Sequence, residues 1–82
     1  RSDFEMTGIP GTDYYTDDRV VEFKYYRSKD ADRMLALTEP LVEHVEQVKG
    51  YAADTKRKFP NYHVRSYIVY ICANKGWKCW EV

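Results

Sequence analysis

The stretch RVVEFKYY, residues 19–26, places a Glu-x-Lys triplet inside an apolar run. Valine, phenylalanine and tyrosine favour extended backbone, so this stretch predicts a β-strand. Successive side chains of a strand point to opposite faces, so Glu22 and Lys24 share one face and the intervening apolar side chains share the other. Two opposite charges on one face of such a strand indicate either a structural ion pair or part of a metal-dependent active site.

A second short strand precedes this one. The segment Arg1–Thr7 favours extended backbone, and the connection that follows is rich in glycine, proline, threonine and aspartate, which are turn formers. A hairpin or meander of the two strands would bring Asp3 close to Glu22. An Asp, a Glu and a Lys on one sheet could hold a hard divalent cation and orient a water molecule, because carboxylate oxygens suit Mg²⁺.

A long amphipathic helix is predicted over Glu39–Lys58. Thr38 is the expected N-cap, and the basic residues 56–58 fall in the last turn. Gln47 and Tyr51 lie one turn apart on the same side of this helix. The residues of its apolar stripe step by three or four positions, and they are Leu41, Val45, Val48, Ala52, Thr55 and Phe59.

The C-terminal third predicts two more strands. Residues 63–73 are β-branched and aromatic, and much of this segment is apolar on both faces, as in a central, covered strand. A turn at 74–76 separates it from an alternating segment that is typical of an edge strand. A short helix is expected over Asp30–Leu37. The whole pattern predicts an α/β fold whose mixed sheet has strands near Arg1–Thr7, Arg19–Tyr26, Val64–Ala73 and Trp77–Val82.

Size and composition predict one small domain over residues 1–82. A hydrophobic content of 44% is enough for a folded core, and no apolar stretch approaches the length of a membrane span. We therefore expect a cytoplasmic domain with no membrane association. The 13 basic and 13 acidic residues balance to a net charge of +0, which argues against strong nonspecific binding of nucleic acid.

The cysteines and histidines give weaker signals. Cys72 and Cys79 could face each other across the last hairpin, but they match no zinc-binding spacing and are expected to be reduced, partly buried thiols. His44 lies one turn before Gln47 on the predicted helix, so it could face the site, but a surface or packing role is the simpler interpretation. The chain has no Gly-rich phosphate loop, so it is not expected to bind ATP.

Three short motifs occur in a recognisable order. They are Arg-Ser-Asp at 1–3, Glu-Phe-Lys at 22–24 and Gln-Val-Lys-Gly-Tyr at 47–51. This order resembles the PD-(D/E)XK nuclease superfamily, and most of all its RecB-like branch, with a Gly-Arg-x-Asp strand, a (D/E)-x-K strand and a Gln-x-x-x-Tyr helix. It is also similar to the nuclease-like domain that follows an AAA-ATPase-like domain in bacterial proteins.

The resemblance implies a restriction-endonuclease-like mixed β-sheet with one long crossover helix. The family core begins with a helix and a strand ahead of the Asp strand, so the N-terminal part of that core is missing from this chain. The chain is therefore expected to be a C-terminal fragment of a longer protein.

The resemblance also implies roles for individual residues. Asp3 and Glu22 would be the metal carboxylates, and the backbone carbonyl of Phe23 would be a further ligand. The metal would be Mg²⁺, with Mn²⁺ as a substitute. Lys24 would position the attacking water, while the helix residues Gln47 and Tyr51 would steady the site or the nucleic-acid strand. The implied function is Mg²⁺-dependent hydrolysis of phosphodiester bonds, with DNA as the expected partner.

Three alternatives remain open from the sequence. Asp13, Asp17 or Asp18 could replace Asp3 as the partner carboxylate of Glu22. The chain could be a catalytically inactive nuclease-fold module that serves in partner binding or assembly. An exposed sheet edge could also be covered by a second copy, which would make the protein a homo-oligomer.

Overall fold

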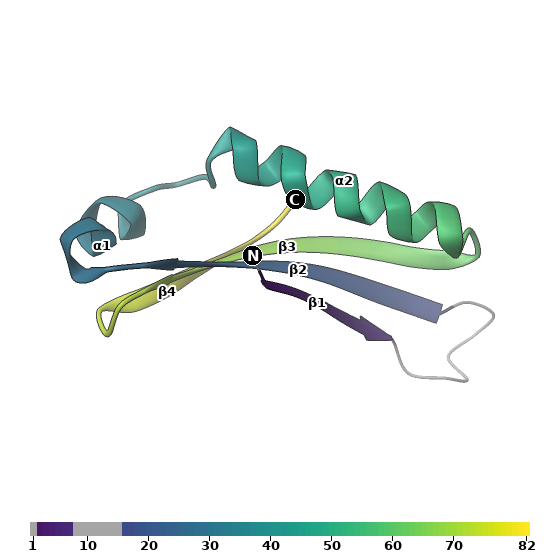
Figure 1. Ribbon diagram of the computed structural model, residues 1–82, viewed down its shortest axis with the longest axis horizontal. Helices are drawn as coiled ribbons and strands as arrows, with labels where there is room; N and C mark the ends of the chain where they lie inside the picture. Colours follow the sequence, from purple (N-terminus) through teal and green to yellow (C-terminus); the bar gives the residue numbers. More distant parts are fainter. Residues whose placement is uncertain (1, 8–15) are drawn as a thin grey trace.

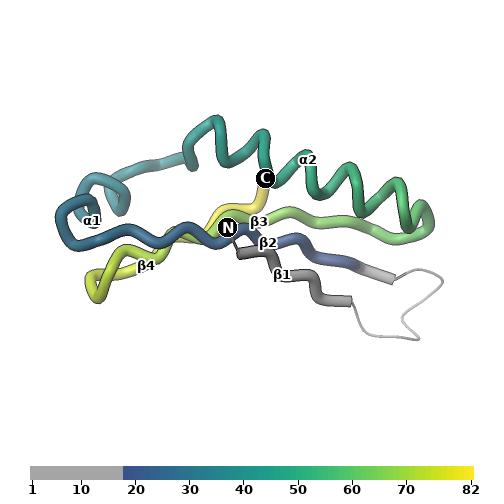
Figure 2. Tube along the Cα trace, in the orientation of Figure 1, coloured from purple at the N-terminus to yellow at the C-terminus, as the bar shows by residue number. Residues whose placement is uncertain are grey.

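The fold is a single mixed β-sheet with two helices on one face (Figures 1 and 2). The computed structural model describes residues 2–7 and 16–82, and it describes side chains from residue 18 onward. The sheet order is β1-β2-β3-β4. In chain order the elements are β1 (Ser2–Thr7), β2 (Thr16–Tyr26), α1 (Ser28–Leu35), α2 (Val42–Lys58), β3 (Tyr62–Cys72) and β4 (Gly76–Glu81).

The strand pairing confirms the predicted mixed sheet. β1 pairs with β2 and β3 pairs with β4 in antiparallel fashion, while β2 and β3 are parallel. Parallel neighbours need a crossover connection, and α1 and α2 together provide it. Both helices lie on the same side of the sheet in Figure 1. The long crossover helix was thus predicted correctly, and the short helix expected at Asp30–Leu37 corresponds to α1.

The predicted start of α2 is wrong. The helix begins at Val42, with Leu41 as an uncapped N-cap residue in extended conformation. The helix starts late because the segment that precedes it, residues 38–41, is hydrogen-bonded to side chains of the sheet. The indole Nε1 of Trp80 donates to the carbonyl oxygen of Thr38 at 3.0 Å, and the hydroxyl of Tyr70 accepts a hydrogen bond from the Leu41 N–H at 2.9 Å. These contacts satisfy backbone groups that a helical turn would otherwise use.

The apolar stripe of α2 largely follows the prediction. Val48 and Thr55 are buried, and Leu41 and Val45 pack against the core. Phe59 is the exception, because it lies beyond the last helical residue and is 42% exposed. Full burial of a valine side chain contributes about 1.5–3 kcal/mol, so this stripe holds α2 on the sheet.

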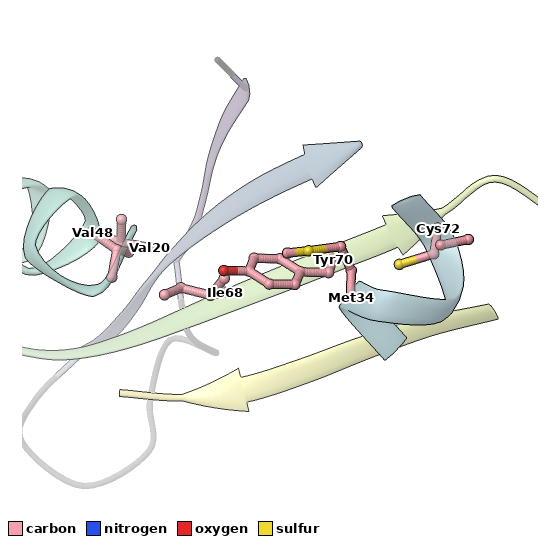
Figure 3. Close-up of a cluster of buried hydrophobic side chains, with 7 residues drawn as sticks. Val20, Met34, Val48, Ile68, Tyr70 and Cys72 are labelled. Atoms are coloured by element: carbon pink, nitrogen blue, oxygen red, sulfur yellow. The ribbon is translucent and has the colours of Figure 1, made fainter. Parts of the chain in front are cut away.

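The core runs along the helix-covered face of β2 and β3 (Figure 3). On β3, Ser66, Ile68, Tyr70 and Cys72 are buried, whereas the alternate positions are half-buried. β3 is therefore central in the sheet but covered by helices on one face, and the expectation of a strand covered on both faces is wrong. Its continuous apolar composition reflects half-buried side chains on the opposite face.

The two cysteines follow the prediction as free thiols, but Cys79 is not partly buried as expected. Both are free thiols; Cys72 is buried and Cys79 is exposed on β4. Cys72 is in register with Gly76 and Cys79 with Val69, so the two thiols do not face each other across the hairpin. No helix in the described ranges is both long and apolar enough to cross a membrane.

Candidate active site

The charged face of β2 points inward. Glu22 is 0% exposed and Val20 on the same face is 2% exposed, whereas the apolar neighbour Tyr25 is 66% exposed. A register slip of one residue would reverse this arrangement, placing the acid outside and the aromatic ring inside. Because burying a carboxylate is costly without compensating interactions, packing alone does not account for an acid at this position.

Lys24 connects β2 to the covering helix through a short polar chain. Its Nζ donates to Oε1 of Gln47 at 3.0 Å, and Nε2 of Gln47 donates to the hydroxyl of Tyr51 at 3.2 Å. The orientation of the amide follows from chemistry, since an ammonium can only donate and the carbonyl end of Gln47 must face it. The structure thus brings together three of the five residues that the sequence singled out.

Asp3 and Glu22 are directly opposite each other. They are Cα partners in the antiparallel β1–β2 pair, and directly opposite residues are the closest cross-strand neighbours in a sheet. The backbone register therefore agrees with the hairpin expected from the sequence. The side chain of Asp3 lies outside the described residues.

The alternative acids differ in how far the structure describes them. Asp13 lies outside the described ranges, as does the side chain of Asp17. Asp18 is buried at 4% exposure and belongs to β2, but it is in register with Thr7, four residues before Glu22. Four strand residues span about 13 Å, so the backbone places Asp18 much farther from Glu22 than it places Asp3.

The donors near Lys24 suit a hard cation. Glu22, the register position of Asp3 and the backbone carbonyl of Phe23 offer only oxygen, which fits Mg²⁺ or Mn²⁺ and not a sulfur-rich zinc site. Among side chains of residues 18–82, no three His, Cys, Asp or Glu groups gather as a metal cluster. The described part of the site therefore contributes one carboxylate, and Mg²⁺ needs only one or two when water and phosphate complete its shell.

His44, which the sequence places one turn before Gln47, is expected to be a surface or packing residue, with a position facing the site as the alternative. Its Nδ1 lies 2.5 Å from the hydroxyl of Tyr70, and the two rings meet edge to face with centroids 5.4 Å apart. Burial lowers the pKa of His44, the positive charge of Lys24 lowers it further, and Glu43 opposes the shift. Because Tyr70 is the register partner of Lys24, the contact with Tyr70 places His44 beside the Lys24–Gln47 bridge. The three-residue spacing from Gln47 was the available signal.

Tyr70 is a residue of this cluster that sequence reasoning missed. It is 0% exposed, and burial raises its pKa, so it stays protonated. Burial, the neighbouring Tyr70 and a hydrogen bond to that residue raise the pKa of Tyr26 to about 12. Tyr70 reads as an ordinary strand tyrosine, and only the parallel register, which pairs it with Lys24, shows its position.

A groove at the start of α2 is separate from this cluster. It encloses about 480 Å³ and is lined by neither Glu22 nor Lys24. Its apolar walls are formed by the first turns of α2, with Val42 and Val45, and by residues 80–82, with Trp80 and Val82.

The fold and the polar cluster define a mixed-sheet α/β domain with an acid and a lysine on one strand beneath a Gln-x-x-x-Tyr helix. The family model of the PD-(D/E)XK nuclease superfamily matches residues 1–81. The chain belongs to this superfamily, and its architecture is consistent with a restriction-endonuclease-like fold. No curated protein and no solved structure matches the chain.

Proposed function

We propose that this domain is a Mg²⁺-dependent nuclease that hydrolyses phosphodiester bonds of DNA, with Asp3, Glu22, Lys24, Gln47 and Tyr51 forming its site. Membership of the nuclease superfamily supports the reaction class. The observation that carries the proposal is the 3.0 Å hydrogen bond from Lys24 to Gln47, next to the buried Glu22 on the same strand face. This hydrogen bond holds the Lys24 ammonium in one position, so the group is preorganised for catalysis.

Lys24 positions the attacking water. Its ammonium has three N–H donors, and the bond to Gln47 uses one, which leaves donors for a water and a phosphate oxygen. Gln47 is held in turn by the hydroxyl of Tyr51, so the amide cannot rotate freely. This arrangement fixes the ammonium before substrate arrives, and preorganised charge is the largest contribution in many active sites.

Asp3, Glu22 and the carbonyl of Phe23 would hold the metal ion. A bound Mg²⁺ would stabilise the negative charge that develops on the scissile phosphate. The chain itself keeps Glu22 away from bulk water and holds Lys24 two residues away on the same face. The carboxylate must be ionised to bind the cation, so metal affinity should fall in acid.

The proposed partner is nucleic acid. The net charge of +0 provides no overall attraction, so binding has to use local groups. The basic last turn of α2, formed by Lys56, Arg57 and Lys58, is one such region. The edge strand β4 is one place where a second copy could pair with the sheet.

A non-catalytic module is the second candidate function. The observation that favours it is the net charge of +0, which provides no overall attraction for nucleic acid. In that case the PD-(D/E)XK fold would serve partner binding or assembly, since fold alone does not fix function.

A plasmid-nicking assay with Mg²⁺, with Mn²⁺ and with EDTA separates the two candidates. Lys24→Ala should lower turnover by about 10²- to 10⁴-fold, which is the usual contribution of a positioned proton-transfer or water-orienting group. Lys78→Ala is the matched control, because Lys78 is also half-buried on a strand and donates to the Leu37 carbonyl at 2.6 Å. Equal activity in Lys24→Ala and wild type would reject the assignment of Lys24, and no cleavage with any metal would favour the non-catalytic module.

A further inference from the structure

Two polar bridges join α2 to neighbouring strands at the same level of the sheet. Lys24 of β2 and Tyr70 of β3 are register partners in the parallel pair. Above them, His44 and Gln47 are one helical turn apart on α2. Lys24 bonds Gln47 at 3.0 Å and Tyr70 lies 2.5 Å from His44, so the second bridge stands directly beside the first.

The protons in the second bridge can be assigned from the donors available. The hydroxyl oxygen of Tyr70 accepts the N–H of Leu41 at 2.9 Å. The hydroxyl has a single hydrogen, and Nδ1 of His44 at 2.5 Å is within reach to accept it. In the arrangement that we adopt, Tyr70 accepts from Leu41 and donates its own hydrogen to Nδ1 of His44.

The tautomer of His44 follows. An Nδ1 that accepts a hydrogen bond is unprotonated, so the neutral ring carries its hydrogen on Nε2. The lowered pKa of His44 agrees with a neutral ring beside the ammonium of Lys24. Within residues 18–82, no hydrogen bond is found at Nε2. His44 therefore offers one N–H donor, fixed in direction by Tyr70.

We propose that His44 is a substrate-binding residue of this site, whose Nε2–H donates a hydrogen bond to a non-bridging oxygen of the phosphodiester that Lys24 also contacts. The proposal rests on the nuclease function proposed above. Lys24 and His44 are then two donors on one phosphate group, one charged and one neutral. A neutral imidazole is a weak acid, so His44 holds the phosphate and does not protonate the leaving group.

A purely structural role makes a different prediction. If His44 only ties α2 to β3, its Nε2 has no contact with substrate, and its removal affects stability without affecting nucleic-acid affinity. The two possibilities can be separated by observing the ring directly, with a readout that does not depend on cleavage.

The first measurement is NMR of ¹⁵N-labelled histidine rings in the wild-type chain. We expect a single Nε2–H tautomer for His44, and we expect Tyr70→Phe to produce a mixture of tautomers because Nδ1 loses its donor. Adding a short DNA duplex in the presence of Ca²⁺, which also binds oxygen ligands, should shift the Nε2 resonance of His44 and leave His63 unchanged. His63 is exposed on β3 and serves as an internal control.

The second measurement is the affinity for the same duplex. His44→Ala should weaken binding about tenfold or more, as expected for loss of a hydrogen bond to a charged group. His44→Gln should recover part of the loss, because its amide can donate from a similar distance, and His63→Gln should bind as wild type does.

Three results would overturn the proposal. An Nδ1–H tautomer would contradict the proton assignment. An Nε2 resonance that stays unmoved at saturating duplex would show that His44 does not touch substrate, while the nuclease function could still hold. Absence of any duplex binding would overturn the nuclease function and this proposal together. The wild-type spectra decide these points even if His44→Ala does not fold.

Discussion

The layers beneath α1 and α2 share one sheet face but differ in chemistry. Between α1 and the sheet the buried residues are Ala31 and Met34 of the helix and Cys72 of β3, and burial raises the pKa of the Cys72 thiol. Between α2 and the sheet, the buried side chains include Val48 of the helix and the fully buried Glu22 of β2. Figure 3 shows the core running from Val48 and Val20 at one end to Met34 and Cys72 at the other.

This difference in side-chain chemistry indicates that the sheet region covered by α1 serves packing alone. The α1 layer shows that this face can be filled with apolar side chains. A buried carboxylate needs compensating interactions, so Glu22 adds a cost that the α1 layer avoids. We infer that the α1 layer mainly stabilises the fold, whereas the α2 layer accepts polar groups for function.

The largest expected effect is on stability, at the α1 end. Met34→Ala should lower the free energy of unfolding by about 2–5 kcal/mol, because it leaves a cavity at a side chain that is 1% exposed. Urea denaturation measures the change, and Mn²⁺ affinity of the folded variant should stay as in wild type. Arg33→Ala on the same helix is the control, since the Arg33 side chain is 69% exposed and its loss should change stability by about 0.5 kcal/mol or less. A Met34→Ala variant as stable as the control would contradict the division between the layers.

The next effect is on metal binding, at the α2 end. Glu22→Gln keeps the size of the side chain but removes its charge, and we expect at least about a tenfold loss of Mn²⁺ affinity, the scale seen when metal-site groups are changed. Isothermal calorimetry measures it. Glu46→Gln, an exposed acid on α2, is the control. Equal Mn²⁺ binding by Glu22→Gln and wild type would show that Glu22 is a structural acid, and the two layers would then differ in packing only.

Local patterns were enough to predict most of the architecture. The Glu-x-Lys strand, the long helix and the final hairpin all follow from side-chain periodicity and turn residues, which depend on near neighbours in the chain. The helix start was wrong because a distant residue, Trp80, binds the carbonyl of Thr38. Such a contact leaves no mark in the local sequence.

The candidate site could be predicted only in part for the same reason. Lys24, Gln47 and Tyr51 were found because each belongs to a short motif with a fixed spacing. The His44–Tyr70 pair lies beside Lys24 only because β2 and β3 are parallel with Lys24 opposite Tyr70. Strand register is a property of the assembled sheet, and single-strand patterns do not specify it.

A smaller effect, on turnover, should follow from removing the hydrogen bond that positions Lys24. Gln47→Ala removes the acceptor of its ammonium, and we expect turnover to fall about tenfold with little change in substrate affinity. Tyr51→Phe should reduce turnover less, because it removes only the group that holds Gln47. Steady-state cleavage kinetics provide the measurement, and Lys49→Ala, at an exposed position of α2, is the control. Loss of affinity without loss of turnover would mean that Gln47 contacts the nucleic acid and does not position Lys24.

The smallest expected effect is a pH dependence of stability that comes from the α2 layer. The folded state lowers the pKa of His44 through burial and then through Lys24, while Glu43 opposes the shift. The unfolded chain, with an ordinary pKa of about 6.5, therefore binds this proton more readily than the folded chain. The contribution of His44 to stability is fully present above about pH 6.5 and decreases as the pH falls through the unfolded pKa toward the lower folded one.

His44→Gln should make this acid-side loss shallower, because glutamine does not titrate. A single proton changes the free energy of unfolding by at most about 1.4 kcal/mol per pH unit, so the difference is small but measurable from thermal midpoints at about pH 7 and pH 5. Lys24→Met should reduce the loss in part, since it removes the nearby positive charge but leaves the burial. Tyr70 of β3 also faces the ring, and its burial-raised pKa keeps it uncharged over this range. His63→Gln is the control. If wild type and His44→Gln lost stability equally between these pH values, His44 would not be held neutral, and the polar layer beneath α2 would lack the proton arrangement assigned to it.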